Sequence, residues 1–195
     1  MRFTCTQENL LQGLALVSHT AGKNPHLPIL SHVLLKTDEG SLKVSTTNLE
    51  MSISALVRGR VEAPGEFTVP AKLFQDYINL LSAGKIELQV QGDVLLIQAD
   101  GKTTKIKGIP STEFPLIPKL AKEVSYRLEP DALKTTISQV AFAVSVSESR
   151  PELSGVACFF QGEVSGHDRA VFAATDSYRL SERVLTLLPG SSAQA

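Results

Sequence analysis

The chain has 195 residues, of which 43% are hydrophobic and 20% are charged, a composition typical of a globular protein with a buried core. Nineteen Lys and Arg residues against twenty Asp and Glu residues give a net charge of −1. This excludes a uniformly basic nucleic-acid binder but not a local basic face. The sequence has no apolar run of the roughly 18 residues that a membrane helix needs and no signal-peptide pattern. Cys5 and Cys158 form no C-x-x-C motif, and we expect both to be small buried residues of a reduced, cytoplasmic protein.

The order of hydrophobic and polar residues predicts two helices and about eight strands over residues 2–107. Thr6 is expected to cap the first helix, and Pro70 to open the second. In chain order we expect a strand over Arg2–Thr6, a helix over Glu8–Thr20, strands over Ser31–Thr37, Ser41–Thr46, Met51–Val57 and Glu66–Val69, a helix over Ala71–Leu81, and strands over Lys85–Gln91, Val94–Ala99 and Lys102–Lys107. The fold class is therefore α+β with mostly antiparallel strands.

The sequence also contains an internal repeat. A shift of 123 residues places Pro28–Val33 on Pro151–Val156, and both segments read P-x-L-S-x-V. Further along, Thr47 meets Thr175 at a shift of 128, which predicts about five extra residues in the second copy near 163–169.

The repeat divides the chain into two expected domains. The first covers residues 1–122, and the proline-rich segment Gly108–Pro118 is the predicted connector. The second, residues 123–195, is shorter than the first. We therefore expect a complete first module and only the N-terminal half of a second one.

Motifs for catalysis are weak in this sequence. Gly101–Thr103 resembles the end of a phosphate-binding loop, but Leu96 stands where the upstream glycine belongs. The four histidines lack metal-ligand spacing, and His167-Asp168 is interpreted as a polar loop within the predicted insertion. We therefore expect no enzyme, no metal and no cofactor.

Five motifs, in this order and spacing, resemble the family of bacterial DNA polymerase III beta subunits, the sliding clamps. They are Leu27–Leu30 (LPIL), Thr47–Met51 (TNLEM), Val69–Lys72 (VPAK), Glu113–Pro115 (EFP) and Ala174–Leu180 (ATDSYRL). The resemblance extends from Met1 to about Leu188. It implies the DNA clamp (processivity) fold, which repeats its module three times in the family. By that comparison the third domain is absent from this chain.

The resemblance also implies a function. Two clamp subunits form a head-to-tail homodimer ring around duplex DNA and tether the replicative polymerase for processive synthesis, with no catalysis of their own. The implied partners are double-stranded DNA, the catalytic subunit of DNA polymerase III, the clamp loader and other proteins with a clamp-binding motif, and no membrane. A near-neutral chain suits a ring that slides, since many phosphate contacts make binding tight and salt-dependent. One alternative stays open, namely a protein-binding module of the same fold that does not encircle DNA.

Two functional surfaces follow from the resemblance. The expected DNA-binding positions are Lys23, Asn24, Lys72, Ser147, Pro151 and Glu152. The expected pocket for partner peptides is formed by Leu153, Thr175, Ser177, Tyr178, Arg179 and Leu180. Such a pocket combines an apolar floor for a Leu or Phe anchor with polar groups at its edge.

The resemblance further implies an edge for dimerisation in the first domain. It consists of the strand over residues 102–108 and the helix over residues 72–81. Lys102, Lys105 and Lys107 are expected on the strand, with Phe74 and Ile78 as apolar contacts.

Overall fold

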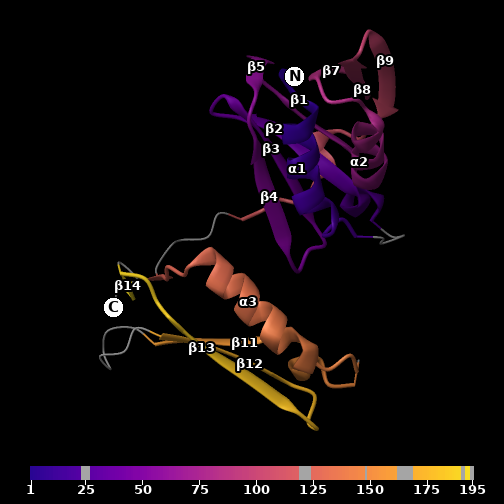
Figure 1. Ribbon diagram of the computed structural model, residues 1–195. Coiled ribbons are helices and arrows are strands. Elements are labelled where there is room, and N and C mark those ends of the chain that lie inside the picture. The colour runs from indigo at the N-terminus through magenta and orange to yellow at the C-terminus, as the bar shows by residue number, and fades with distance from the viewer. Residues whose placement is uncertain (23–26, 119–123, 148, 162–168, 190–191, 194–195) are drawn as a thin grey trace. The chain divides into compact units, whose positions relative to one another are not determined.

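The computed structural model describes residues 1–22, 27–118, 124–147, 149–161, 169–189 and 192–193. The predicted sites at Lys23 and Asn24, and the predicted loop at His167 and Asp168, lie outside these residues. The chain divides into two compact units, unit 1 (Met1–Pro118) and unit 2 (Lys119–Ala195), both shown in Figure 1. Each unit has its own core, and the two are described separately.

Unit 1 begins with a strand and a capped helix. Strand β1 (Arg2–Thr6) leads into helix α1 (Gln7–Ser18), and the Thr6 side chain accepts a hydrogen bond from the Asn9 backbone N–H. The cap satisfies an amide that has no partner within the helix. Leu10, Leu14 and Val17 form the buried face of α1, as the apolar spacing predicts.

Two antiparallel sheets complete unit 1. Their strand orders are β5-β1-β7-β8-β9 and β4-β3-β2-β6. The strands are β2 (His32–Asp38), β3 (Ser41–Thr47), β4 (Ser52–Val57), β5 (Arg60–Ala63), β6 (Glu66–Pro70), β7 (Lys85–Gln91), β8 (Val94–Ala99) and β9 (Lys102–Lys107). The expected α+β class with antiparallel strands is confirmed, but the sequence analysis missed β5.

Helix α2 (Ala71–Leu80) follows β6 and precedes β7 in sequence. Its side chains Phe74 and Ile78 are wholly buried, and they belong to a core formed by both helices and both sheets. The prediction that Phe74 and Ile78 contact a second subunit is therefore wrong. The exposed apolar side chains of α2 are Leu73 and Leu80, which lie away from the core on the helical wheel.

The predicted connector does not leave unit 1 at once. Phe114 is buried together with Ile29 and Leu30 in a small apolar cluster. Upstream, the Thr68 hydroxyl donates to the Ile109 carbonyl at 2.6 Å, and the Ile109 N–H donates to the Thr68 carbonyl at 3.2 Å. A short 3₁₀ helix, η2 (Ser111–Glu113), lies between these contacts. The connector thus packs on unit 1 at least as far as Phe114.

The described part of unit 2 contains one long helix and a three-stranded antiparallel sheet. Helix α3 (Pro130–Val140) packs against β12 (Arg169–Thr175) and β13 (Leu180–Thr186), and β11 (Ala157–Gln161) pairs with β12. The smaller elements are β10 (Val124–Ser125), which pairs with β14 (Ser192–Ala193), and the 3₁₀ helices η3 (Ala141–Ala143) and η4 (Pro151–Leu153). In the corresponding place, unit 1 has the 3₁₀ helix η1 (Pro28–Ser31).

The core of unit 2 is small. Val140, Ala170, Phe172 and Leu187 are buried, and the Phe160 ring stacks on Tyr126 with 4.5 Å between ring centroids. Cys158 on β11 is exposed, whereas Cys5 on β1 is buried, so the expectation that both cysteines are buried is wrong for Cys158. Among the described strands, β11 has β12 as its only neighbour. The side chains of such an edge strand are open to solvent on the side where no second strand lies.

The two units repeat the same elements at the predicted shifts. Helix α3 begins 123 residues after α1, and β12 and β13 begin 128 residues after β3 and β4. The two units differ in the neighbours of β2 and of β11, the strand that corresponds to β2 in the repeat. Strand β2 pairs with both β3 and β6, while β11 pairs with β12 alone among the strands that the structure describes.

Candidate functional site

The motif Ala174–Leu180 forms the turn between β12 and β13, and we call residues 175–180 the β12–β13 turn. Asp176 directs its Oδ1 at this turn and accepts hydrogen bonds from the backbone N–H groups of Tyr178 and Arg179, both at 3.0 Å. The Thr175 hydroxyl donates to the Arg179 carbonyl at 2.8 Å. Short polar side chains that bond to nearby backbone favour turns of this kind.

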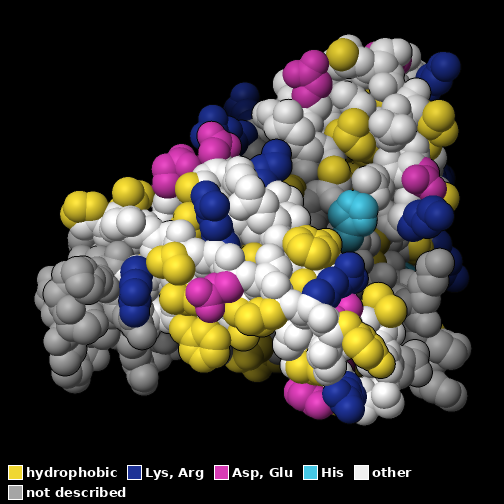
Figure 2. All heavy atoms as spheres, turned by 60° about the horizontal axis from the view of Figure 1, so that its bottom comes forward, with side chains coloured by type: hydrophobic (Ala, Val, Ile, Leu, Met, Phe, Trp, Pro, Cys, Tyr) yellow, Lys and Arg dark blue, Asp and Glu magenta, His cyan; other side chains and the backbone are white. Residues whose placement is uncertain are grey.

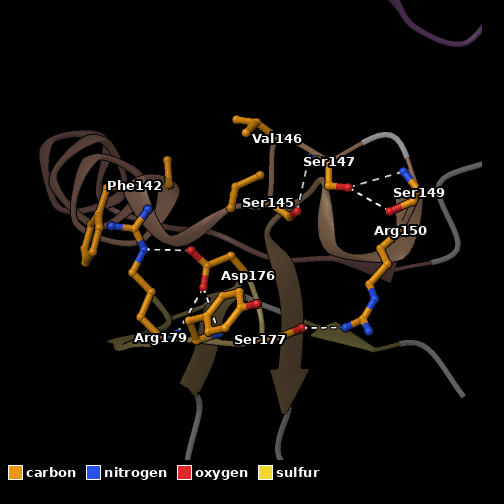
Figure 3. Close-up of a pocket in the computed structure, with 12 residues that line it drawn as sticks. Phe142, Ser145, Val146, Ser147, Ser149, Arg150, Asp176, Ser177 and Arg179 are labelled. Carbon is orange, nitrogen blue, oxygen red and sulfur yellow. Dashed lines mark hydrogen bonds and ion pairs between the residues drawn. The ribbon is translucent and has the colours of Figure 1, made fainter.

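Asp176 also holds the Arg179 side chain. Arg179 Nε lies 2.9 Å from Asp176 Oδ2, and the guanidinium lies over the Phe142 ring, 5.4 Å from its centroid (Figure 3). Hydrogen bonds from the Tyr178 and Arg179 amides, with the Arg179 charge, lower the pKa of Asp176. The carboxylate is therefore charged at neutral pH, and the Arg179 guanidinium is held in place on two sides.

One side of the turn borders a polar hollow of about 810 Å³. Arg150 reaches it from the loop after η3, and its Nη1 donates to Ser177 Oγ at 2.8 Å. Ser147 lies across the hollow and shares a 2.8 Å hydrogen bond with Ser149 (Figure 3). Guanidinium and hydroxyl groups stand at the rim of this hollow beside the apolar side chains of Phe142, Val144 and Val146, so it offers a ligand both hydrogen bonds and apolar contact.

The other side of the turn borders a second, smaller hollow of about 330 Å³. Its lining is mostly apolar or small and consists of Pro151, Glu152, Leu153, Ser154, Gly155, Val156, Ala157, Ala173, Ala174, Thr175 and Leu180. Leu180 is 69% exposed, although it is a large apolar side chain. An open apolar hollow of this size fits one or two apolar side chains of a peptide.

The predicted peptide pocket is thus divided between two hollows. Leu153, Thr175 and Leu180 line the apolar hollow. Ser177, Tyr178 and Arg179 line the polar hollow on the other side of the same turn. Tyr178 is 98% exposed, so its ring is free to cover a ligand in the polar hollow that it lines.

The described residues predicted to bind DNA lie in different surroundings. Lys72 is an exposed residue in the first turn of α2, and Ser147 borders the polar hollow. Pro151 and Glu152 belong to η4 and line the apolar hollow beside Leu153.

The lysines of the predicted dimer edge are accessible. Lys102, Lys105 and Lys107 are exposed on β9, which is the edge strand of its sheet. Lys107 Nζ lies 3.7 Å from an Asp93 carboxylate oxygen. An edge strand with lysines resists unspecific strand pairing, so any partner has to match this charge.

Three residues of the site were missed as functional candidates by the sequence analysis, namely Phe142, Arg150 and Asp176. A carboxylate two residues before Tyr178 is a recognisable turn signal. No local pattern, however, shows that Phe142 reaches Arg179 or that Arg150 reaches Ser177, since each pair is more than 25 residues apart in sequence.

Neither a metal centre nor a membrane-spanning helix is found among the described residues. Within the described ranges, no group of three or more His, Cys, Asp and Glu side chains is placed to hold a metal ion. No described helix has the length and apolar content needed to cross a membrane.

Solved structures similar to this chain are sliding clamps. The DNA polymerase sliding clamp of Caulobacter crescentus matches 98% of this chain with 52% of its own, at 27% identity and a TM-score of 0.86. The clamp of Pseudomonas aeruginosa, solved with griselimycin bound, matches 100% of this chain with 52% of its own, at 27% identity and a TM-score of 0.87. The fold is therefore that of a DNA sliding clamp, as the resemblance implied.

Sequence relatives carry the same description. The beta sliding clamp of Salmonella typhimurium is 34% identical over 183 residues, which is 93% of this chain and 49% of the relative. The beta sliding clamp homolog GriR of Streptomyces muensis is 30% identical over 97% of this chain and 49% of its own length. The chain thus spans about half the length of the curated relatives that it matches.

Two family patterns match consecutive parts of the chain. The N-terminal domain of the DNA polymerase III beta subunit matches residues 1–118, and its central domain matches residues 127–194. The chain belongs to the DNA polymerase III beta subunit family.

Proposed function

We propose that this chain forms two consecutive modules of a DNA sliding clamp subunit, which encircles duplex DNA and tethers the replicative polymerase. Residues 1–122 are the first clamp module and residues 123–195 the N-terminal half of the second. The observation that carries the proposal is the agreement of both units, in order, with half of a solved clamp at a TM-score of 0.86. In this role the protein is a processivity factor without its own catalysis, acts in the cytoplasm beside the DNA, and assembles as a head-to-tail homodimer in its full-length form.

The proposed DNA surface is built from weakly charged, polar positions. Lys72 and Ser147 are exposed, and in this proposal they lie near phosphates together with Lys23, Asn24, Pro151 and Glu152. Contacts of this kind read the backbone and not the bases, so binding is independent of sequence and weakens with salt. A ring that holds DNA by topology needs no stronger contact.

The proposed site for partner proteins is the pair of hollows around the β12–β13 turn. The apolar hollow at Leu153, Thr175 and Leu180 receives the apolar anchor of a clamp-binding peptide. The polar side at Ser177 and Arg179 orients the peptide backbone and its polar groups. The polymerase catalytic subunit, the clamp loader and other proteins with such a motif would share this site and compete for it. The lysines of β9 remain the proposed contact with a second subunit.

A peptide-binding experiment tests the partner site on this chain. The probe is a blocked five-residue peptide with adjacent Leu and Phe among serines, and its affinity is measured by fluorescence anisotropy. Leu180→Asp should abolish binding, because a carboxylate in an apolar hollow is costly to desolvate. Leu80→Asp is the matched control, since Leu80 is 82% exposed on α2. Equal loss in both variants would contradict the proposed pocket.

A chimera tests the role at DNA. Residues 1–188 replace the matched half of the Salmonella typhimurium clamp, and primer extension length is measured with that organism's polymerase. A folded, dimeric chimera should support long products, and Lys72→Glu should shorten them most at low salt, where the contact between Lys72 and a phosphate is least screened. If the dimeric chimera bound the peptide but gave only short products, the module that does not encircle DNA would be the better account.

A further inference from the structure

Among the described residues of unit 2, no helix packs on one of the two faces of the sheet. Helix α3 packs on the face that carries Ala170 and Phe172. Because side chains alternate along a strand, the opposite face carries Phe159, Val171 and Val184, which are direct cross-strand neighbours. We call these three residues the outer ladder.

The outer ladder is apolar and accessible. Phe159 is 59% exposed and Val184 is 47% exposed, while Val171 between them is half-buried. Figure 2 turns the bottom of Figure 1 forward and shows hydrophobic side chains gathered in its lower half, with acidic and basic side chains between and beside them. Contiguous exposed apolar side chains on a sheet face are unusual unless something covers them.

Unit 1 shows that the fold does not require apolar residues here. At the predicted shifts of the repeat, the outer ladder corresponds to Lys36, Lys43 and Leu56, which are also direct cross-strand neighbours. Lys36 forms an ion pair with Glu66 at 2.9 Å. The same surface is therefore mostly charged in unit 1 and apolar in unit 2, which indicates a role specific to unit 2.

Along β11 and β12 the outer ladder continues the apolar hollow. Ala157, Ala173, Thr175 and Leu180 line the hollow and lie on the same face of the sheet. Phe159 and Val171 follow Ala157 and Ala173 by two residues along their strands. From Thr175 to Val171 is four residues, or roughly 13 Å along the strand, a span that about four residues of extended peptide cover.

We propose that a peptide bound in the apolar hollow continues along this sheet and places a second apolar side chain on the outer ladder, about four residues from its anchor. The inference rests on the proposed partner site. The surface area of three side chains is far smaller than the roughly 800 Å² per partner that a stable dimer buries. This favours a short peptide over a second copy of the chain. Exposed Glu182 lies opposite Ala173, between hollow and ladder, and favours a basic residue in the peptide between its two apolar side chains.

Extended versions of the peptide probe test the inference on the 195-residue chain. Four residues are added at either end, with Leu at the far position in one version and Ser in its control. For extension at one of the two ends, the Leu version should bind about fivefold tighter than its Ser control, because one apolar side chain becomes largely buried on the outer ladder. Phe159→Lys introduces the lysine that unit 1 has at the corresponding position, Lys36. This substitution should remove the gain in affinity and leave the affinity of the short probe unchanged. Leu56→Lys is the matched control in unit 1 and should change neither.

The outcomes separate the two proposals. If the short probe binds but Leu and Ser versions bind equally in both directions, the outer ladder is not a peptide site and the hollow stands. If the short probe does not bind, both are wrong. Circular dichroism checks the fold of Phe159→Lys, and Val184→Thr is the milder second variant that must also reduce the gain. Self-association of the chain that Phe159→Lys abolishes would assign the face to a second copy and overturn the inference.

Discussion

Leu49 and Ser177 occupy the same place in two copies of one turn, and both have a φ angle of +78°. In each copy the preceding side chain holds the turn. Asn48 Oδ1 accepts from the N–H groups of Glu50 and Met51, as Asp176 Oδ1 does from the corresponding amides of its turn. A left-handed conformation is costly for a side chain such as leucine. The paired hydrogen bonds therefore explain why the motifs TN and TD stand at matching places in the repeat.

The turn at Asp176 should respond to pH. Because the folded-state pKa of Asp176 is lowered, its contribution to stability is present above the unfolded-state pKa and is lost as pH falls through the lower folded value. The amide shifts of Tyr178 and Arg179 should titrate below the ordinary range of an Asp, and Asp176→Asn should remove that titration. A midpoint at or above the ordinary Asp pKa would contradict the hydrogen-bonded carboxylate.

Unit 1 should lose stability in mild acid because of His32. This side chain is 7% exposed and lies 3.2 Å from the Thr68 hydroxyl. Burial lowers the pKa of His32, and the nearby Glu113 carboxylate opposes this less strongly. Below about pH 6.5 the unfolded chain binds the proton more readily than the folded one. The free energy of unfolding therefore decreases as the pH is lowered, until the pKa of the folded state is reached. Denaturant unfolding of unit 1 at several pH values measures this loss.

Substitutions assign that loss to one histidine. His32→Gln should flatten the pH dependence between pH 7 and pH 5. His19→Gln, which changes an exposed side chain at the end of α1, should leave it as in the parent. Equal slopes for the parent and His32→Gln would show that another group is responsible.

The two cysteines should react with thiol reagents at very different rates. Burial raises the pKa of the Cys5 thiol to about 12, and the thiolate is the reactive form. Cys158 is exposed on β11. A colorimetric disulfide reagent should therefore modify about one thiol per chain in the folded protein. Denaturant should release the second, and Cys158→Ser should abolish the fast reaction. A fast reaction that survives Cys158→Ser would mean that Cys5 is accessible.

Gly108 should resist replacement because two parts of unit 1 meet there. A Cβ on Gly108 would lie 2.0 Å from the Thr68 carbonyl oxygen and 2.4 Å from the Phe67 ring. Gly108→Ala should lower the free energy of unfolding of unit 1 by about 2–3 kcal/mol. A Cβ at Gly155 meets no atom within 4 Å, so Gly155→Ala is the control and should change stability by less than about 1 kcal/mol. Equal effects of the two variants would contradict the close approach at Gly108.

Turn residues explain why most strands of unit 1 could be predicted from sequence. The β2–β3 and β8–β9 hairpins close with Glu39-Gly40 and Asp100-Gly101, and all four residues have positive φ angles. Two-residue hairpin turns need that conformation, so the sequence marks the strand ends closely. Strand β5 has only four residues and is followed by Pro64-Gly65, and so short a run shows too little alternation to be recognised as a strand.

The site was less predictable than the strands. The motif at residues 174–180 entered the prediction only through its resemblance to the family, and the turn in which Thr175 and Asp176 bond to nearby backbone was not expected. That Phe142 supports Arg179, or that Phe74 faces inward while Leu73 faces outward, depends on contacts made only in the folded chain. A hydrophobic residue in an amphipathic helix looks the same in sequence whether a core or a partner buries it.

The packing of the connector decides where the gene for unit 1 can be cut. A fragment that ends with β9 at Lys107 would expose Ile29 and Leu30 to water and deprive the Thr68 hydroxyl of its acceptor at Ile109. Such a fragment should aggregate or express poorly. A fragment that ends after Pro118 retains Phe114 and with it the cover of that apolar cluster. Crystallisation, screening and labelling of unit 1 by itself should therefore use residues 1–118.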